Sequence, residues 1–139
     1  MDRARPEGRY RKSARVRKRA EYLLVQQDGR RVTTRHFVLL CYARPISDPA
    51  RPRLGITASR KVGIAIVRNR AKRLVRESFR STSGLWSPGL DLVVIVRRAL
   101  TDMKLDDVTA ELLAHRRIIE KKSQQAFDDL RVRQSPTPA

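Results

Sequence analysis

The sequence RLGITASRKVGIAIVRNRAKRLVRESFR occupies residues 53–80 and predicts a strand followed by a long helix. In residues 53–59, Leu54, Ile56 and Ala58 alternate with smaller or polar residues, which is typical of a strand. From residue 63 or 64 to residue 80, apolar or small residues recur at helical spacing. This face of the predicted helix consists of Ile64, Val67, Ala71, Leu74, Val75 and Ser78.

The opposite side of the same helix is basic. Asn69, Lys72, Arg73, Arg76 and Arg80 follow one another at i, i+3, i+4, i+7 and i+11. Successive helical turns are about 5.4 Å apart, and arginine forks make bidentate contacts with phosphates. The pattern therefore predicts a helix that lies along a nucleic-acid backbone, without distinguishing RNA from DNA.

The net charge supports the same interpretation. The 139 residues include 32 Lys and Arg against 14 Asp and Glu, for a formal charge of +18. Residues 1–20 hold nine basic and two acidic side chains, and residues 58–80 hold eight basic and one acidic. A charge run is usually a solvated helix face, but these two runs lack the acidic residues that would neutralise them. We therefore expect a polyanionic partner.

The rest of the chain completes an α/β pattern. We expect a helix over 17–27 with Ala20, Leu23, Leu24 and Gln27 as its inner stripe, and a strand over 32–43. A proline-containing loop over 44–52 precedes the strand at 53–59, and the apolar run LDLVVIV at 90–96 indicates a strand covered on both faces. A helix over 105–123 follows.

These elements predict one α/β domain with helices packed on a small sheet. Residues 1–15 are expected to form a disordered basic arm, 16–125 the folded domain and 126–139 a flexible tail. By the general rule, a strand–helix–strand crossover would be right-handed.

Several function classes are disfavoured. With one cysteine, Cys41, and two histidines, His36 and His115, the chain offers neither a disulfide framework nor a zinc cluster. Asp106 and Asp107 suit a helix start rather than a metal site. We therefore expect no catalytic residue and no metal ligand in this chain. The sequence contains no apolar run long enough for a membrane span and no signal-peptide pattern, so we expect a cytoplasmic protein.

Certain motifs resemble bacterial ribonuclease P protein components. The resemblance rests on Leu54-Gly55-Ile56-Thr57, Ser59-Arg60-Lys61-Val62-Gly63, Arg68-Asn69-Arg70, Lys72-Arg73, and Arg76-Glu77-Ser78-Phe79. It extends to residues 35–39 and 91–95, and covers about residues 15–122.

The resemblance implies the protein subunit of a ribonucleoprotein endonuclease, a hydrolase that removes the 5′ leader from precursor tRNA. The catalyst would be the RNA subunit with its magnesium ions, and the protein alone would bind no cofactor. It implies a mixed sheet with a left-handed crossover. The residues implied to bind the catalytic RNA are Arg60, Lys61, Arg68, Asn69, Arg70, Lys72, Arg73, Arg76 and Arg80. Those implied for the leader cleft are Tyr22, Gln26, His36, Val38 and Leu40.

Within that cleft, Gln26 and Leu40 stand where relatives can have aromatic residues, which leaves Tyr22 as the clearest stacking residue. Partial burial in helix packing is the alternative for Tyr22, and a core position is expected for Phe37 and Phe79. The sequence assigns no function to Trp86.

Two other function classes remain open from composition alone. One is a structural RNA-binding protein of another ribonucleoprotein, such as the ribosome. The other is a DNA-binding protein with its basic helix in the major groove. The helix argues against DNA, because only Asn69 on its exposed face suits reading base edges. We expect partners to be the catalytic RNA and precursor tRNA, with neither DNA nor a membrane.

Overall fold

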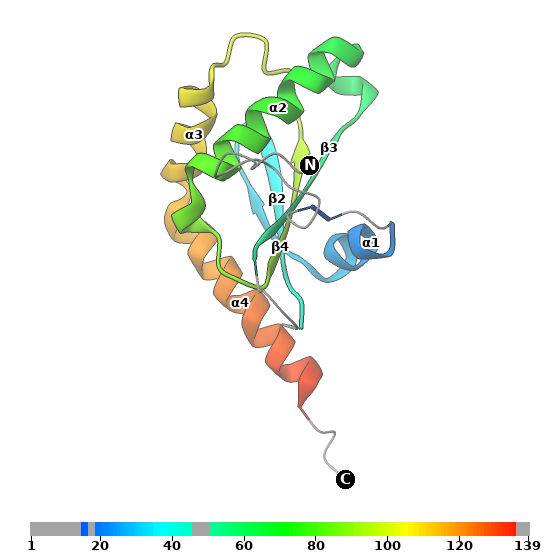
Figure 1. The fold of residues 1–139 in the computed structure, drawn as a ribbon, viewed down its shortest axis with the longest axis vertical. Helices are drawn as coiled ribbons and strands as arrows, with labels where there is room; N and C mark the ends of the chain where they lie inside the picture. The colour runs from blue at the N-terminus through cyan, green and yellow to red at the C-terminus, as the bar shows by residue number, and fades with distance from the viewer. Residues whose placement is uncertain (1–14, 17–18, 46–50, 136–139) are drawn as a thin grey trace, which may run out of the picture.

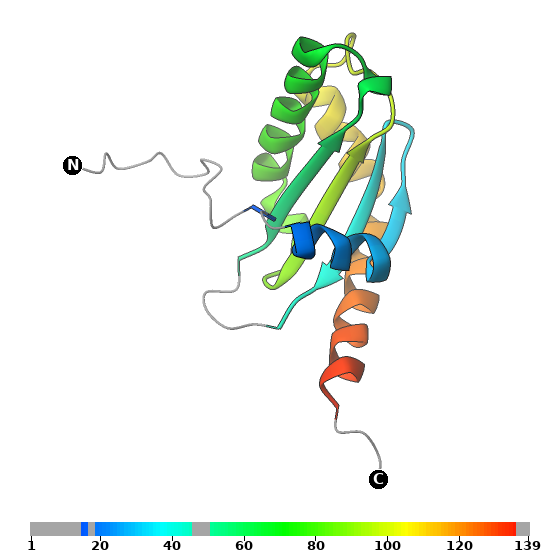
Figure 2. The ribbon, with the colours of Figure 1, turned by 90° about the vertical axis from the view of Figure 1, so that its right-hand side faces the viewer.

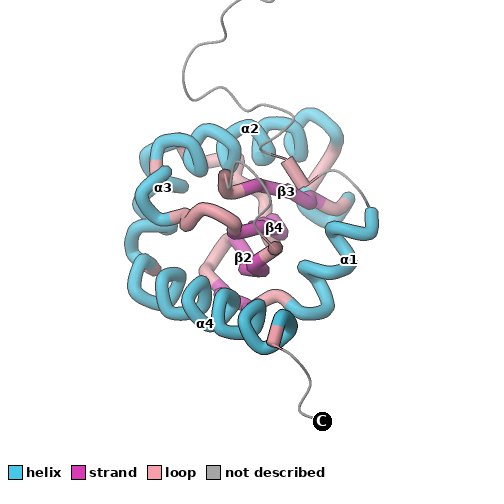
Figure 3. The backbone as a smooth tube through the Cα atoms, turned by 60° about the horizontal axis from the view of Figure 1, so that its bottom comes forward, coloured by secondary structure: helices cyan, strands magenta, loops and turns pink. Residues whose placement is uncertain are grey.

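A four-stranded mixed sheet with helices on both faces forms the protein (Figures 1 and 3). The computed structural model describes residues 15–16, 19–45 and 51–135. The helices are α1 (Arg19–Asp28), α2 (Ala65–Ser81), α3 (Leu105–Ala114) and α4 (Arg116–Gln134), with short 3-10 turns η2 (Arg60–Val62) and η3 (Ser83–Leu85). The strands are β1 (Arg30–Thr33), β2 (Phe37–Ala43), β3 (Arg53–Ala58) and β4 (Leu90–Val96).

The strand order is β1-β2-β4-β3, and only β3 and β4 run parallel. Helix α2 connects these two strands. In Figure 2 both strands run upward, β3 lies to the left of β4, and α1 faces the viewer. The side chains of α2 pack with the larger core cluster on the other face of the sheet from α1. A connection that moves rightward behind the sheet is left-handed, so the crossover departs from the general rule and confirms the expectation from the resemblance.

Each face of the sheet has its own core cluster. Phe37, Leu39 and Cys41 of β2 point towards α2, α3 and α4, and their neighbours Leu40 and Tyr42 point towards α1. The residues of β2 therefore alternate between the two faces of the sheet, as in a regular strand. Strand β4 is buried on both faces from Leu90 to Val94, as its apolar run predicts.

Two predicted elements are divided in the structure. The strand expected over 32–43 is a hairpin of β1 and β2, because the Thr34 hydroxyl accepts a hydrogen bond from Phe37 N at 3.1 Å and closes the turn. The helix expected over 105–123 breaks at His115 and continues as α4 to Gln134. The prediction of a flexible tail from residue 126 is wrong as far as Gln134, because Ala126 and Leu130 are buried. Residues 136–139 and residues 1–14 of the expected basic arm lie outside the described residues.

Helix α1 is rotated from the predicted orientation. Leu23 and Leu24 are 43% and 46% exposed, whereas Val25 is fully buried and Tyr22 half-buried. The close fit of Tyr22 explains the rotation, because a Cβ added at Gly55 would lie 2.8 Å from the Tyr22 Oη. The predicted inner stripe of α1 is therefore wrong: the helix rests on the sheet through Tyr22 and Val25.

A buried carboxylate fixes the position of α1. Asp91 of β4 is 2% exposed and accepts hydrogen bonds from Arg53 Nε and Nη2 at 2.8 and 2.7 Å. Arg44 Nη1 adds a third at 2.8 Å. Arg53 also reaches Glu21 of α1 at 2.8 Å. The hydrogen bond to Asp91 raises the pKa of Arg53, and burial lowers the pKa of Arg44. We call these four residues the Asp91 network.

Replacing Asp91 with alanine leaves two half-buried guanidinium groups without their shared carboxylate. Removing one partner of a buried ion pair costs about 3–5 kcal/mol, so we expect Asp91→Ala to lower the free energy of unfolding by that amount in urea titrations. Asp128→Ala removes an exposed carboxylate that pairs with Arg131 one turn away, and it is expected to cost less than about 1 kcal/mol. Equal losses in the two variants would contradict a central role for Asp91.

Candidate nucleic-acid interface

The outer face of α2 forms an exposed row of polar and basic side chains. The inner face buries Ala71, Leu74, Val75 and Ser78 against the sheet and α3, as predicted, and Val67 is partly buried beside them. The prediction is wrong for Ile64, which is 70% exposed because it is the N-cap residue with extended backbone, before the first turn of the helix. The residues that are exposed on the outer face are Ile66, Asn69, Arg70, Arg73 and Arg80, which we call the outer stripe. Arg68, Lys72 and Arg76 are partly buried at its flanks. The structure thus brings the predicted residues of the helix onto one continuous side.

The positive charge on α2 is mostly uncompensated. The helix carries six basic side chains and one acidic one, Glu77. Among the described residues, no carboxylate forms a salt bridge with Lys72, Arg73 or Arg80. Since like charges on neighbouring turns repel one another, this arrangement favours binding of an anion.

Arg70 also has a structural contact. Its Nη1 and Nη2 donate to the carbonyl oxygens of Leu100 and Met103, each at 2.6 Å. These contacts hold the segment between β4 and α3 against α2. A guanidinium has five N–H donors, so three remain for a ligand.

The segment before α2 places two further cations at the start of the helix. Arg60 and Lys61 are exposed in η2, which leads to Gly63. Gly63 has a φ of 147°, where side chains are disfavoured, and a Cβ there would lie 2.9 Å from Val67 Cγ1. The glycine therefore permits the sharp entry into α2 that places Arg60 and Lys61 just before the first turn of the helix.

The residues predicted for the leader cleft are only partly brought together. Tyr22 lies with Val38 in the smaller core cluster under α1, and burial raises the pKa of its phenol, partly offset by a hydrogen bond with the Ile56 backbone. Gln26 is exposed, one turn further along α1. Leu40 is only 4% exposed and is packed beneath α1, so its side chain forms core rather than surface.

His36 lies apart, in the turn between β1 and β2. Its Nδ1 is 2.6 Å from Glu111 Oε1 of α3, and its backbone N–H donates to Glu111 Oε2 at 2.9 Å. Thr34 Oγ1 donates to the same carboxylate at 2.6 Å. Partial burial alone would raise the pKa of Glu111, but these hydrogen bonds outweigh burial and lower the pKa. The ring of His36 is thus tied to α3, away from Tyr22.

Strand register identifies three residues beside Val38 that the sequence analysis missed. Thr33, Val38, Ile95 and Thr57 are successive partners across β1, β2, β4 and β3, so their side chains share one face. Each is at least partly exposed. We call these four residues the open row. The alternation of side chains along a strand assigns Ile95 to one face of 90–96 and Thr57 to one face of 53–59. Only the register between the strands shows that both lie in one row with Val38.

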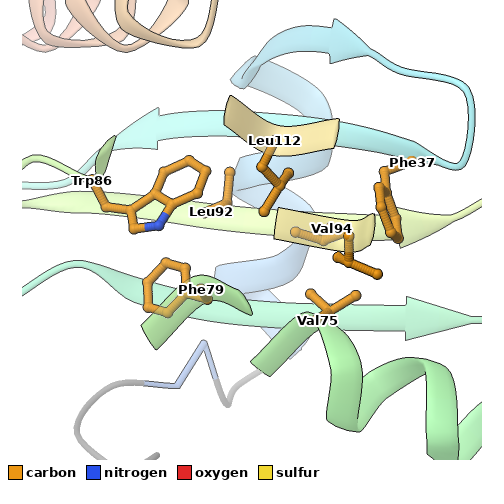
Figure 4. Close-up of a pocket in the computed structure, with 8 residues that line it drawn as sticks. Phe37, Val75, Phe79, Trp86, Leu92, Val94 and Leu112 are labelled. Atoms are coloured by element: carbon orange, nitrogen blue, oxygen red, sulfur yellow. The ribbon is translucent and has the colours of Figure 1, made fainter. Parts of the chain in front are cut away.

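The apolar cavity between the sheet and the helices is not a ligand site. An apolar cavity of about 10 Å³ lies between α2, α3 and the sheet (Figure 4), and it is too small for more than a water molecule. Phe79 stacks on Trp86 beside it with ring centroids 5.4 Å apart. Phe37 is fully buried, as predicted, while Phe79 is only partly buried and packs against the core. Trp86 therefore acts in packing, and its Nε1 donates to Thr82 Oγ1 at 3.2 Å.

The remaining candidate groups are structural. Cys41 is buried, and burial raises the pKa of its thiol to about 11. Asp107 accepts a hydrogen bond from Lys104 N at 2.8 Å and caps α3, as expected. Within the described ranges, no three His, Cys, Asp or Glu side chains are grouped as metal ligands. None of the described helices is long and apolar enough to cross a membrane.

Comparison with known proteins identifies the family. A sequence model described as Ribonuclease P matches residues 10–120. The ribonuclease P protein component of Syntrophus aciditrophicus is 42% identical over 101 residues, covering 73% of this chain and 82% of that protein. The chain belongs to the ribonuclease P protein component family. It is thus the protein subunit of ribonuclease P, an endoribonuclease involved in tRNA 5′ maturation. Membership implies association with ribonuclease P RNA and precursor tRNA.

Solved structures support this assignment and the fold. The RNase P protein of Staphylococcus aureus is 30% identical, with a TM-score of 0.64 over 78% of this chain and 96% of that one. The protein from Thermotoga maritima is 33% identical, with a TM-score of 0.63 over 77% and 96%. The family match ends at residue 120, whereas α4 continues to Gln134.

Proposed function

We propose that the outer stripe of α2, with Arg60 and Lys61, binds the ribonuclease P RNA, and that Tyr22 and the open row contact the 5′ leader of precursor tRNA. The observation that carries this proposal is the continuous exposed basic side of α2. Bidentate arginine contacts to phosphates, spaced by helical turns, suit a folded RNA backbone. The residues proposed to bind this RNA are Arg60, Lys61, Arg68, Asn69, Arg70, Lys72, Arg73, Arg76 and Arg80.

The leader contact is proposed on different chemistry. A single strand is bound by stacking of its bases on aromatic side chains and by apolar surface beside a basic groove. Tyr22 supplies the aromatic ring, and Val38 and Ile95 supply the apolar surface. Gln26 borders Tyr22 on α1. Leu40 contributes by supporting α1 from below, and His36 by the ring nitrogen that Glu111 leaves free.

The proposed division of labour places the chemistry on the RNA subunit. Magnesium ions held by that RNA would supply the activated water and stabilise the leaving oxygen. This chain positions RNA and leader and neutralises phosphate charge, and we assign it no cofactor of its own. We propose that it acts in the cytoplasm, with neither DNA nor a membrane as partner.

Reconstitution tests the proposed function directly. The purified chain is added to the ribonuclease P RNA of its own organism with precursor tRNA, at a magnesium concentration too low for efficient cleavage by the RNA alone. We expect leader removal to increase with protein concentration until the RNA is saturated. A structural RNA-binding protein of another ribonucleoprotein would leave cleavage unchanged across the titration, and that result would refute the proposal.

Arg73→Ala tests the phosphate contact of the outer stripe. Removing a single phosphate contact reduces the slope of log K against log salt by about 0.7–0.9, so we expect weaker RNA binding with a slope reduced by that amount. Filter binding of the ribonuclease P RNA at several salt concentrations measures it. Arg131→Ala is the matched control, because Arg131 is also exposed but lies near the far end of α4. An unchanged slope for Arg73→Ala would exclude Arg73 from the residues that bind phosphate.

Tyr22 variants test the leader contact. Stacking of one base contributes about 1–3 kcal/mol, so Tyr22→Ala should weaken holoenzyme binding of precursor tRNA by roughly 5- to 150-fold and leave mature tRNA nearly unaffected. Tyr22→Phe keeps the ring over Gly55 and is expected to retain most of the affinity. Equal losses for precursor and mature tRNA would instead indicate that Tyr22 only supports the packing of α1.

A further inference from the structure

Two large apolar side chains are exposed where α2 begins. Ile64 is 70% exposed and Ile66 is 76% exposed. Among the described residues, only Val132, near the end of α4, is a comparably exposed large apolar residue. Ile66 heads the outer stripe, because Asn69, Arg70 and Arg73 follow it at i+3, i+4 and i+7 and share its face. Ile66 is therefore continuous with the basic surface, and Ile64 is exposed at the same end of the helix, at its N-cap.

Ile64 is an unfavourable choice for the folded chain alone. It occupies the N-cap of α2 with φ −67° and ψ 170°, and its side chain makes no capping hydrogen bond. Serine, threonine, aspartate and asparagine stabilise this position, and isoleucine is among the poorest residues there. Neither helix capping nor core packing accounts for an exposed β-branched side chain at this site, which leaves contact with a partner.

The surroundings define the chemistry of that partner. Arg60 and Lys61 are exposed just before the pair, and the first turn of α2 contains no acidic residue. The Nε of Arg68 is buried and has no hydrogen-bond partner among the described residues. A surface that is apolar at its centre and cationic on both sides complements a nucleotide, whose base is flat and apolar on its faces and whose phosphates are anionic. An apolar protein surface would leave these cations unpaired.

We propose that Ile64 and Ile66 pack against an unpaired nucleobase of the ribonuclease P RNA, whose flanking phosphates are held by Arg60, Lys61 and the outer stripe. This inference rests on the proposed RNA contact of α2 and extends it from phosphates to a base. It assigns the contact to the catalytic RNA rather than to the leader, because Ile66 lies on the outer face of α2 with Asn69 and Arg73. The pair thus adds a preference for unpaired over fully base-paired RNA.

Serine variants of the pair test this contact. Ile64→Ser supplies a favourable N-cap and Ile66→Ser changes an exposed position, so neither variant loses core packing. For the double variant, we expect the Kd for the ribonuclease P RNA to rise about 5- to 30-fold, the range for losing part of the burial of two isoleucine side chains. The salt slope should stay that of the unmodified chain, because no charge is removed, in contrast to Arg73→Ala. Val132→Ser is the matched control and should leave the Kd unchanged.

A fully paired RNA hairpin of matched length is the second probe. The double variant should bind this hairpin as tightly as the unmodified chain does. An unchanged Kd of the double variant for the ribonuclease P RNA would overturn the base contact, and so would equal losses of affinity for both RNAs. Neither result would affect the proposed function, which the reconstituted cleavage tests separately. Failure of the unmodified chain to bind the ribonuclease P RNA would instead refute the proposed function itself.

Discussion

Asp91 is the charged group around which the other elements are arranged. Its buried carboxylate lies on β4, receives two hydrogen bonds from Arg53 of β3 and one from Arg44 just beyond β2, and through Arg53 is connected to Glu21 of α1. A buried carboxylate is costly unless every partner is in place. These contacts connect β4, β3, the end of β2 and α1, so the network favours this assembly of the parallel pair and α1.

Two groups of arginine side chains can be distinguished, one paired with carboxylates and one on the outer face of α2. Between packed elements, guanidinium groups are paired with carboxylates. Arg53 pairs with Asp91 and Arg30 pairs with Asp129, each at 2.7 Å. On the outer face of α2, no described carboxylate forms a salt bridge with Lys72, Arg73 or Arg80, and an anion would relieve the repulsion between neighbouring cations. Arg70 of the second group also acts within the fold, because it holds the segment before α3 with two donors and keeps three donors for a ligand. The packing of the inner face of α2 therefore offsets the repulsion among the cations on its outer face.

The elements with strong local patterns were predictable from the sequence. The apolar stripe of α2 and the continuous apolar run of β4 were correctly identified because burial periodicity acts over a few residues. The hairpin turn at Thr34 was missed because it contains neither glycine nor asparagine and is held by Glu111, 77 residues away. The rotation of α1 depends on the fit of Tyr22 over Gly55, which sequence spacing does not encode. Likewise the grouping of cationic residues on one side of α2 was predictable, whereas the open row needed the strand register.

The second half of α4 shows how contacts distant in the sequence can reverse a compositional prediction. Residues 126–134 are rich in charge and were expected to be flexible, yet Leu130 is buried and Asp129 receives two hydrogen bonds from Arg30, 99 residues earlier. Arg133 lies 4.5 Å over the ring of Tyr42 and donates to the Ala43 carbonyl at 2.6 Å. Arg30 directly follows the α1–β1 junction, and Tyr42 packs beneath α1. The second half of α4, which lies beyond the family match, therefore stabilises the region of the sheet on which α1 and Tyr22 rest. Through Tyr42, the end of α4 thus contacts the smaller core cluster against which Tyr22 packs.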